Sequence, residues 1–249
     1  MNILGKIFQK KEPLVPVDLS FLGGDIHSHL IPGIDDGSPS MSDSLVLAQG
    51  MVDLGYQKAV TTPHVMSDFY RNTPEIIKKG LLQLNGAIKN AGIKLTVEAA
   101  AEYYIDYDFL KKIGNEELLT FGQRYVLVEF SFVEPPRNMK EAFFELQTNG
   151  YKPILAHPER YLYWNQNPKE LLELKDRDVL FQVNLLSLFG NYGPEICRAG
   201  EFLIEHRLVE WLGTDMHHAN HLINLKNYQL KASLVEKIHQ LPLLNQNLL

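Results

Sequence analysis

The sequence contains little of what several large classes of protein require. Its 249 residues include one cysteine, Cys197, which excludes an internal disulfide and a cysteine-based zinc cluster and fits a reducing compartment. The residues on either side of it, 195–198, have the pattern of a helix face and not of a phosphate-binding loop. The sequence therefore does not favour a phosphatase with a cysteine nucleophile.

The chain also has no excess of positive charge and no long apolar run. Its 24 Lys and Arg residues are outnumbered by 30 Asp and Glu residues, for a net charge of −6, and they form no basic stripe. Nucleic acid is therefore not expected as a partner. No segment has the length of a transmembrane helix, and the N-terminus lacks a signal-peptide pattern. We expect a cytoplasmic protein that associates with the inner face of a membrane through a partner. Residues 1–12 have a short basic amphipathic pattern, for which a frayed or locally packed terminus is favoured over contact with an anionic membrane.

What the sequence does contain is a repeated order of a short apolar strand followed by a helix. Helix-start signals occur at Ser40 and at Thr73-Pro74, and Gly55 and Gly92 mark the ends of these two helices. Helical patterns also cover residues 138–150, 168–175 and 194–207. The predicted strands are residues 24–29, 58–62, 93–100, 125–131, 152–156, 179–184 and 209–214. This alternation predicts parallel βαβ units in one α/β domain.

Six of the seven predicted strands carry a histidine, an aspartate or a glutamate at the C-terminal end. An open sheet would gather its polar groups at one switch point, so this spread favours a closed parallel barrel with its active site at the strand ends. His27 and His29 are two residues apart and therefore point to the same face of an extended strand. The candidate residues are His27, His29, Asp35 or Asp36, His64, Glu102, Glu129, His157, Asp215 and His217.

These side chains predict a metal cluster. Each one alone has a structural explanation, but burying so many ionisable groups at one barrel mouth is costly unless a cation neutralises them. They are too many for one tetrahedral zinc ion, and they suffice for two or three ions. Imidazole and carboxylate ligands without thiolates suit manganese, iron or zinc. Arg160, three residues after His157, has the planar fork that binds phosphate oxygens, with a surface ion pair as its alternative role.

Taken in order, these motifs resemble a known superfamily. The series His-x-His, Asp-Asp-Gly, Thr-Pro-His, Ala-Glu-Tyr-Tyr, Val-Glu-Phe-Ser, Ala-His-Pro-Glu-Arg, Gln-Val-Asn and Asp-Met-His, between residues 23 and 249, is similar to that of the PHP (polymerase and histidinol phosphatase) superfamily. Within it, the chain most resembles the manganese-dependent bacterial protein-tyrosine phosphatases of the CpsB/YwqE type.

The resemblance implies a fold and a set of ligands. The fold would be a distorted seven-stranded TIM-like barrel over residues 21–249, with residues 1–20 as an N-terminal extension. Two or three divalent ions would be bound, with manganese expected and iron or zinc as alternatives. The implied ligands are His27, His29, Glu129 and Asp215 for one ion, Glu102, Glu129 and His157 for a second, and Asp36, His64 and His217 for a third. Asp36 is preferred over Asp35 because the ligand in the family is the aspartate that adjoins the glycine.

The same resemblance implies the activity. It is the metal-dependent hydrolysis of phosphotyrosine in proteins, with Arg160 on the phosphate and with the C-terminal tail of a bacterial tyrosine kinase of capsule or exopolysaccharide export as substrate. One departure is that no arginine follows His217, which leaves His218 or His221 as candidates for a second phosphate contact. Two alternatives remain, a phosphoesterase for a small monoester such as histidinol phosphate and a metal-bound regulator without turnover.

Overall fold

Short apolar runs form the strands of a closed, distorted barrel in the computed structural model, which describes residues 12–115, 117–165 and 167–249. All pairings within the two barrel sheets are parallel. The six-stranded sheet has the order β10 (Trp211–Gly213), β9 (Leu180–Asn184), β8 (Lys152–Ala156), β7 (Tyr125–Glu129), β6 (Glu102–Tyr104) and β4 (His64–Val65). The three-stranded sheet has the order β2 (Gly24–Asp25), β3 (Lys58–Thr61) and β5 (Thr96–Ala99).

The two sheets join into one ring. β3 runs into β4 and β5 into β6, and the hydrogen bond from Ala100 N to Thr61 O, 3.0 Å, continues the pairing across both breaks. The ring closes where Asp215 N donates to His27 O and His29 N donates to Met216 O, both at 2.8 Å. Seven strand positions therefore surround the core, which confirms the predicted seven-stranded α/β barrel.

The first predicted strand differs from the expectation. Residues 24–29 were expected to form one strand, but only β2, Gly24–Asp25, is regular. The residues that follow form isolated hydrogen bonds with both neighbours, because His27 O accepts from Asp215 N while Ser28 O accepts from Thr62 N, 2.7 Å. The second strand breaks at Pro63, which has no N–H to donate. These irregular stretches are the distortion of the barrel.

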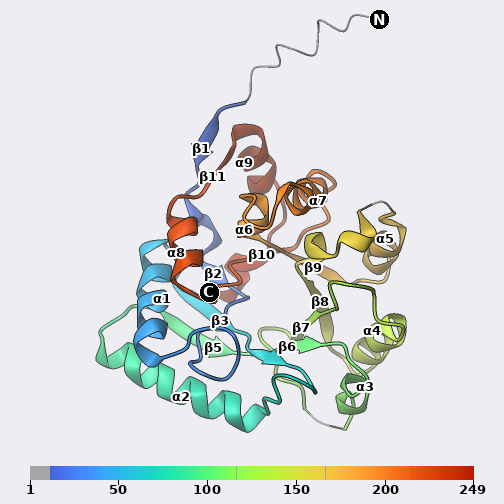
Figure 1. Ribbon diagram of the computed structural model, residues 1–249, viewed down its shortest axis with the longest axis horizontal. Coiled ribbons are helices and arrows are strands. Elements are labelled where there is room, and N and C mark those ends of the chain that lie inside the picture. The colour runs from blue at the N-terminus through green and yellow to red at the C-terminus, as the bar shows by residue number, and fades with distance from the viewer. Residues whose placement is uncertain (1–11, 116, 166) are drawn as a thin grey trace, which may run out of the picture.

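Helices cover the outside of the ring (Figure 1). The helices that the sequence predicted are α1 (Met41–Asp53), α2 (Pro74–Asn90), α4 (Met139–Thr148), α5 (Lys169–Lys175) and α7 (Pro194–Glu205). Ser40 and Thr73 cap α1 and α2 as predicted, since their side chains accept from Asp43 N and Ile76 N. The sequence did not predict α3 (Phe109–Lys112), α6 (Leu185–Leu188), α8 (Ala219–Lys226), α9 (Ala232–His239), or the 3-10 helices η2 (Leu19–Leu22), η3 (Pro158–Arg160), η4 (Leu162–Trp164) and η5 (Asn245–Leu248). Among the described residues, no helix has the length and apolar character needed to cross a bilayer.

The part of the predicted N-terminal extension that the structure describes packs on the barrel. β1 (Leu14–Pro16) pairs antiparallel with β11 (Gln229–Lys231), and Leu19 is buried in the main core. Residues 1–11 of that predicted extension lie outside the described residues.

The C-terminal residues close the barrel at the N-terminal ends of its strands, opposite the mouth. Leu248 packs with Ile26, Val60 and Trp211 inside the ring. The buried Asn245 side chain accepts from Leu212 N, 3.1 Å, and donates to the carbonyls of Leu212 and Gly24, 2.8 and 2.9 Å. The last turn of the chain thus joins β10 to β2.

We expect Asn245→Ala to lower the free energy of unfolding by about 2–4 kcal/mol, because it leaves buried backbone groups of the barrel without partners. Urea denaturation measures this loss. Asn247→Ala, at an exposed position of the same 3-10 helix, is the matched control and should change stability little. Equal effects of the two substitutions would show that the Asn245 hydrogen bonds do not hold the ends of the barrel together.

Candidate metal centre

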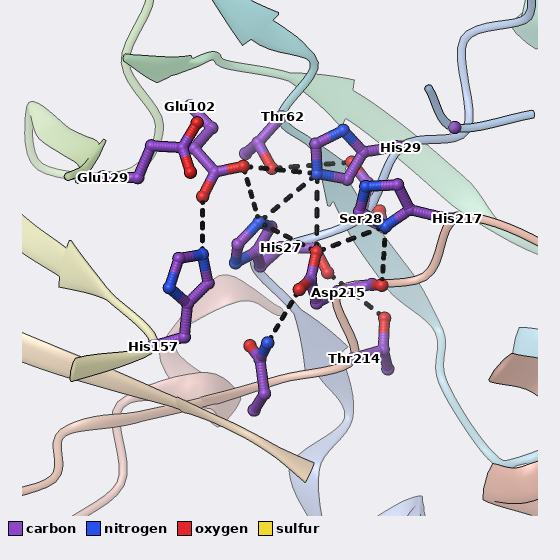
Figure 2. Close-up of polar contacts among 12 residues, drawn as sticks. His27, Ser28, His29, Thr62, Glu102, Glu129, His157, Thr214, Asp215 and His217 are labelled. Atoms are coloured by element: carbon purple, nitrogen blue, oxygen red, sulfur yellow. Dashed lines mark hydrogen bonds and ion pairs between the residues drawn. The ribbon is translucent and has the colours of Figure 1, made fainter. Parts of the chain in front are cut away.

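The nine predicted metal ligands converge at the C-terminal mouth of the barrel. Figure 2 labels all of them except Asp36 and His64. His27 and His29 follow β2 and lie with their Nε2 atoms 3.4 Å apart, which bears out the expectation that they point to one face. The others are His64 at the start of β4, Glu102 at the start of β6, Glu129 at the end of β7, His157 after β8, and Asp215 and His217 after β10, with Asp36 on the loop before α1.

Two of these residues have an unusual backbone conformation. His157 has φ 35° and Asp215 has φ 50°, in the left-handed region that residues other than glycine rarely adopt. His157 comes directly after β8 and Asp215 two residues after β10, so each left-handed residue turns the chain sharply while its side chain faces the mouth. Such strain persists where the surrounding structure fixes it and is concentrated at functional sites.

Glu102 occupies the middle of the cluster. Its buried carboxylate has Oε2 at 3.0 Å from His27 Nε2, 3.4 Å from His29 Nε2 and 3.2 Å from His64 Nδ1. Its other oxygen, Oε1, lies 3.1 Å from His157 Nε2. The two oxygens of one carboxylate therefore face different histidines, which is the arrangement of a ligand shared between ions.

Glu129, which the resemblance implies as a ligand of two ions, lies beside His64. Its Oε1 lies 2.9 Å from His64 Nδ1, and it can join a metal-binding group with His64 and Glu102. His27, His29 and Asp215 form a separate group that Glu129 does not enter. Glu102 does not enter that group either, but it occurs in two others, one with His27 and His157 and one with His64 and Glu129.

Asp36, His64 and His217 come together as expected, and His29 joins them. Asp36 Oδ1 lies 3.4 Å from His64 Nε2 and 3.6 Å from His217 Nε2. Asp36 is half-exposed and faces the cluster from its rim. Asp35, the alternative, is instead bonded to His29 Nδ1 at 2.8 Å and so orients that ring from behind.

The electrostatics of the cluster attract positive charge. Burial favours neutral His27, but the carboxylates of Glu102 and Asp215 outweigh burial and raise the pKa of His27 to about 10. The pKa of His217 rises to about 9 because Asp215 likewise outweighs burial. His157 is the exception, since burial lowers its pKa to about 4. A buried site that holds positive charge this strongly suits a cation better than a neutral ligand.

One nitrogen shows that the geometry fits an ion. His64 Nδ1 is buried and makes no hydrogen bond with the described residues, although carboxylate oxygens of Glu102 and Glu129 lie 3.2 and 2.9 Å away. All three groups offer one atom within 4.8 Å of the others. One nitrogen and two oxygens therefore converge without the alignment that hydrogen bonds require. This is the arrangement expected of three ligands that bind the same metal ion. The imidazole and carboxylate donors, with no thiolate among them, suit manganese, iron or zinc.

A row of amides supports the ligands from behind, and the candidate residues did not include them. Gln182 Oε1 lies 2.7 Å from His27 Nδ1, Gln182 Nε2 donates to Asn184 Oδ1 at 2.8 Å, and Asn184 Nδ2 donates to Asp215 Oδ2 at 2.7 Å. The signal in the sequence is the alternation of Gln182 and Asn184, which places two polar side chains on one face of an apolar strand. A Cβ at Gly213 would lie 2.6 Å from Gln182 Nε2, so this row needs a glycine beside it.

Asp25 is a further support that the candidate residues did not include. It is buried and accepts from Thr214 N and Oγ1 at 2.8 and 2.9 Å, which fixes the residue before Asp215 against the residues before His27. Burial raises the pKa of the Asp25 carboxyl to about 7, with the Thr214 hydrogen bonds opposing the shift. The signal in the sequence is an acidic residue two positions before His27, which an extended chain places on the same face as His27 and His29.

Arg160 lies at the wall of the site, on η3. Its guanidinium is stacked between the rings of Phe132 and Tyr192, 4.6 and 4.5 Å from their centroids, and Nη1 donates to Asp215 Oδ2 at 3.2 Å. The alternative role for Arg160 was an ion pair at the surface. Its ion pair is instead with Asp215, a residue of the cluster. These side chains and most of the cluster line an open cavity of about 270 Å³, which also includes His218 and His221. His221 Nδ1 is bonded at the base of the cluster, 3.0 Å from Asp215 O.

Cys197 has no part in this site. It lies on α7, where its thiol donates to Leu188 O, and burial raises its pKa. A thiol with a raised pKa is a poor nucleophile. The position of Cys197 on α7, outside the cluster, therefore agrees with the sequence, which does not favour a cysteine nucleophile.

Known proteins are similar to this chain in sequence and in fold. Residues 24–227 match the family described as "Capsular polysaccharide synthesis, CpsB/CapC". The chain is 30% identical to the tyrosine-protein phosphatase YwqE of Bacillus subtilis strain 168, over 84% of this chain and 82% of that one. It is 29% identical to the tyrosine-protein phosphatase CpsB of Streptococcus pneumoniae, over 78% and 82% of the two chains. A crystal structure from work on these two metal-dependent tyrosine phosphatases superimposes with a TM-score of 0.75 at 28% identity, over 86% of this chain and 90% of the other. The chain therefore belongs to the CpsB/CapC family of capsular polysaccharide synthesis proteins.

Proposed function

We propose that this protein is a metal-dependent protein-tyrosine phosphatase. The observation that carries the proposal is the buried cluster of histidines and carboxylates, which opens into the same cavity as Arg160. The family relationship supports it, because relatives over most of the chain are named tyrosine-protein phosphatases. Hydrolysis of a phosphate monoester requires positive charge for the phosphate oxygens and a means to activate water. Arg160 and a metal-loaded cluster would supply them.

The proposed metal ligands are those that the sequence indicated, with Glu102 as the shared carboxylate. The ligand set is His27, His29, Asp36, His64, Glu102, Glu129, His157, Asp215 and His217. The groups overlap, which suits two or three neighbouring ions, with manganese as the proposed ion. When bound, divalent ions at such a site would lower the pKa of a bound water and stabilise the charge of the phosphoryl group.

The protein's own groups would bind and orient the substrate. Arg160 offers its planar fork to two phosphate oxygens, and the rings of Phe132 and Tyr192 on either side keep that fork from rotating. The bond from Arg160 to Asp215 holds the guanidinium at the edge of the cluster. His218 and His221, which also line the cavity, are the proposed contacts in place of a second arginine.

The cavity shape favours a tyrosyl phosphate on a protein. It is open to solvent, and Phe132, Tyr192 and Tyr70 provide aromatic surface around it, with Tyr70 stacked on His64 at 5.4 Å between centroids. A phenyl ring packs well on such surfaces. We further propose that the substrate is the C-terminal tail of a bacterial tyrosine kinase in capsule or exopolysaccharide export. Association with the cytoplasmic face of the membrane would then occur through that kinase.

The test offers the purified protein, supplied with manganese, three substrates side by side. These are a phosphotyrosine peptide, a phosphoserine peptide and histidinol phosphate. We expect kcat/KM to be highest for phosphotyrosine, and activity to fall with a chelator and return with manganese. A preference for histidinol phosphate would support the small-molecule alternative, and metal binding without turnover of any substrate would support a regulator.

A further inference from the structure

Large apolar side chains are exposed on three neighbouring loops at the mouth of the barrel. These mouth loops, residues 66–73, 105–108 and 130–138, follow β4, β6 and β7, which are adjacent in the sheet. Phe69 is 78% exposed, Tyr107 80% and Val133 85%. Among the large apolar residues that the structure describes, only Leu82, at 75%, is comparably exposed, and it lies on α2. Solvent-exposed apolar groups gathered in one place mark a binding surface.

One residue holds the three loops together. Asp106 Oδ2 accepts from Ser67 N at 2.9 Å, and Asp106 O accepts from the Asn138 side chain at 3.4 Å. Within its own loop, Asp106 Oδ1 accepts from Asp108 N and Phe109 N, both at 2.9 Å. The loops that carry the exposed side chains are therefore joined to one another by hydrogen bonds.

The surface continues into the candidate active site. Phe132, next to Val133, is partly exposed and also lines the cavity beside Arg160. Tyr70, next to Phe69, stacks on His64. A chain that places one residue in the cavity would therefore carry its neighbouring residues over Phe69 and Val133.

We propose that Phe69, Tyr107 and Val133, together the apolar rim, bind the polypeptide next to the phosphotyrosine, and that they prefer apolar side chains there. This inference rests on the proposed function and adds the site that distinguishes a protein substrate from a small phosphate ester. Charges of both signs lie on these loops, Asp68 and Arg71 on the first and Glu134 and Arg137 on the third, so no single sign of charge selects the occupant. Lys111, beside them, is paired with Asp108 at 2.6 Å and lies over the Tyr107 ring at 4.2 Å.

The size of the rim favours a peptide over a second copy of the chain. A stable dimer buries roughly 800 Å² on each partner. Phe69 and Tyr107 offer at most about 150–250 Å² each, and Val133 less. The three together therefore provide less than one partner's share of a dimer interface, which suits a few residues of an extended segment.

The experiment compares the wild type with a variant that carries Phe69→Ser, Tyr107→Ser and Val133→Ser. Three substrates are used, a phosphotyrosine peptide with apolar neighbours, the same peptide with serine and glycine in their place, and 4-nitrophenyl phosphate. We expect KM for the first peptide to rise about tenfold or more, with kcat unchanged, since a few apolar contacts carry most of such binding. KM for the other two substrates should change less than twofold. Leu82→Ser is the matched control and should leave all three substrates unaffected.

Other outcomes would overturn the proposal in distinguishable ways. An unchanged KM for the apolar peptide, or an equal loss with 4-nitrophenyl phosphate, would show that the rim does not bind the flanking chain. A wild-type dimer in analytical ultracentrifugation that becomes a monomer in the variant would identify the rim as a contact between copies. A wild-type protein that hydrolyses none of the three substrates in the presence of manganese would instead contradict the proposed function itself.

Discussion

Replacing Glu102 with glutamine is expected to remove bound metal and activity together. The carboxylate faces four histidines, and each of its two oxygens serves a different part of the cluster. Glutamine has nearly the same shape but lacks the negative charge and presents an NH₂ group in place of one oxygen. The amide would repel a cation where the carboxylate attracted one. We therefore expect kcat/KM for a phosphotyrosine peptide to fall at least about 10³-fold, or about 4 kcal/mol of transition-state stabilisation.

Glu129→Gln is the matched comparison for this prediction. Glu129 contacts only His64 among the cluster histidines at 2.9 Å, so its loss should affect one ion. Metal content by elemental analysis and circular dichroism should be recorded on the same preparations as the kinetics. The expected order is a larger metal loss for Glu102→Gln than for Glu129→Gln, with both variants folded. The reverse order would indicate that Glu129, and not Glu102, is the ligand shared between ions.

Arg160→Ala is expected to leave the metal ions bound and to lower kcat/KM about 30- to 1000-fold. This corresponds to about 2–4 kcal/mol, as for other single preorganised contacts in low-dielectric sites. Arg160 has no metal-donor atom, and its fork is held between Phe132 and Tyr192 at the edge of the cluster. If it also binds the phosphate before reaction, KM should rise as kcat falls. With no arginine after His217, the chain should depend on Arg160 heavily.

Two further variants sharpen this measurement. Arg160→Lys should recover only part of the activity, because an ammonium group cannot reproduce the bidentate fork. Arg177→Ala removes an exposed arginine away from the cavity and should change nothing. A loss below threefold for Arg160→Ala at full metal occupancy would refute its role on the phosphate and direct attention to His218 and His221.

Much of the fold followed from local patterns in the sequence. Strand positions, helix starts at Ser40 and Thr73, and the closed barrel were predicted because apolar runs and capping residues act over a few residues of chain. The irregular stretch after Asp25 was not predicted, because its hydrogen bonds go to two different neighbours far away in the sequence. The last turn, with Asn245, was missed for the same reason.

The sequence by itself also determined which kinds of residue meet at the mouth, since parallel strands bring their C-terminal ends to one edge whatever the loops between them do. Only the tertiary structure decided which of those side chains lie within contact distance of one another. Glu102 and His27 are 75 residues apart, and only the packing of the barrel places their side chains at 3.0 Å and leaves Glu129 farther out. The same applies to Gln182 and Asn184, whose role behind His27 depends on distances across the barrel. Local patterns fix where a side chain leaves its strand, but ligand geometry is set by contacts between strands that no local pattern records.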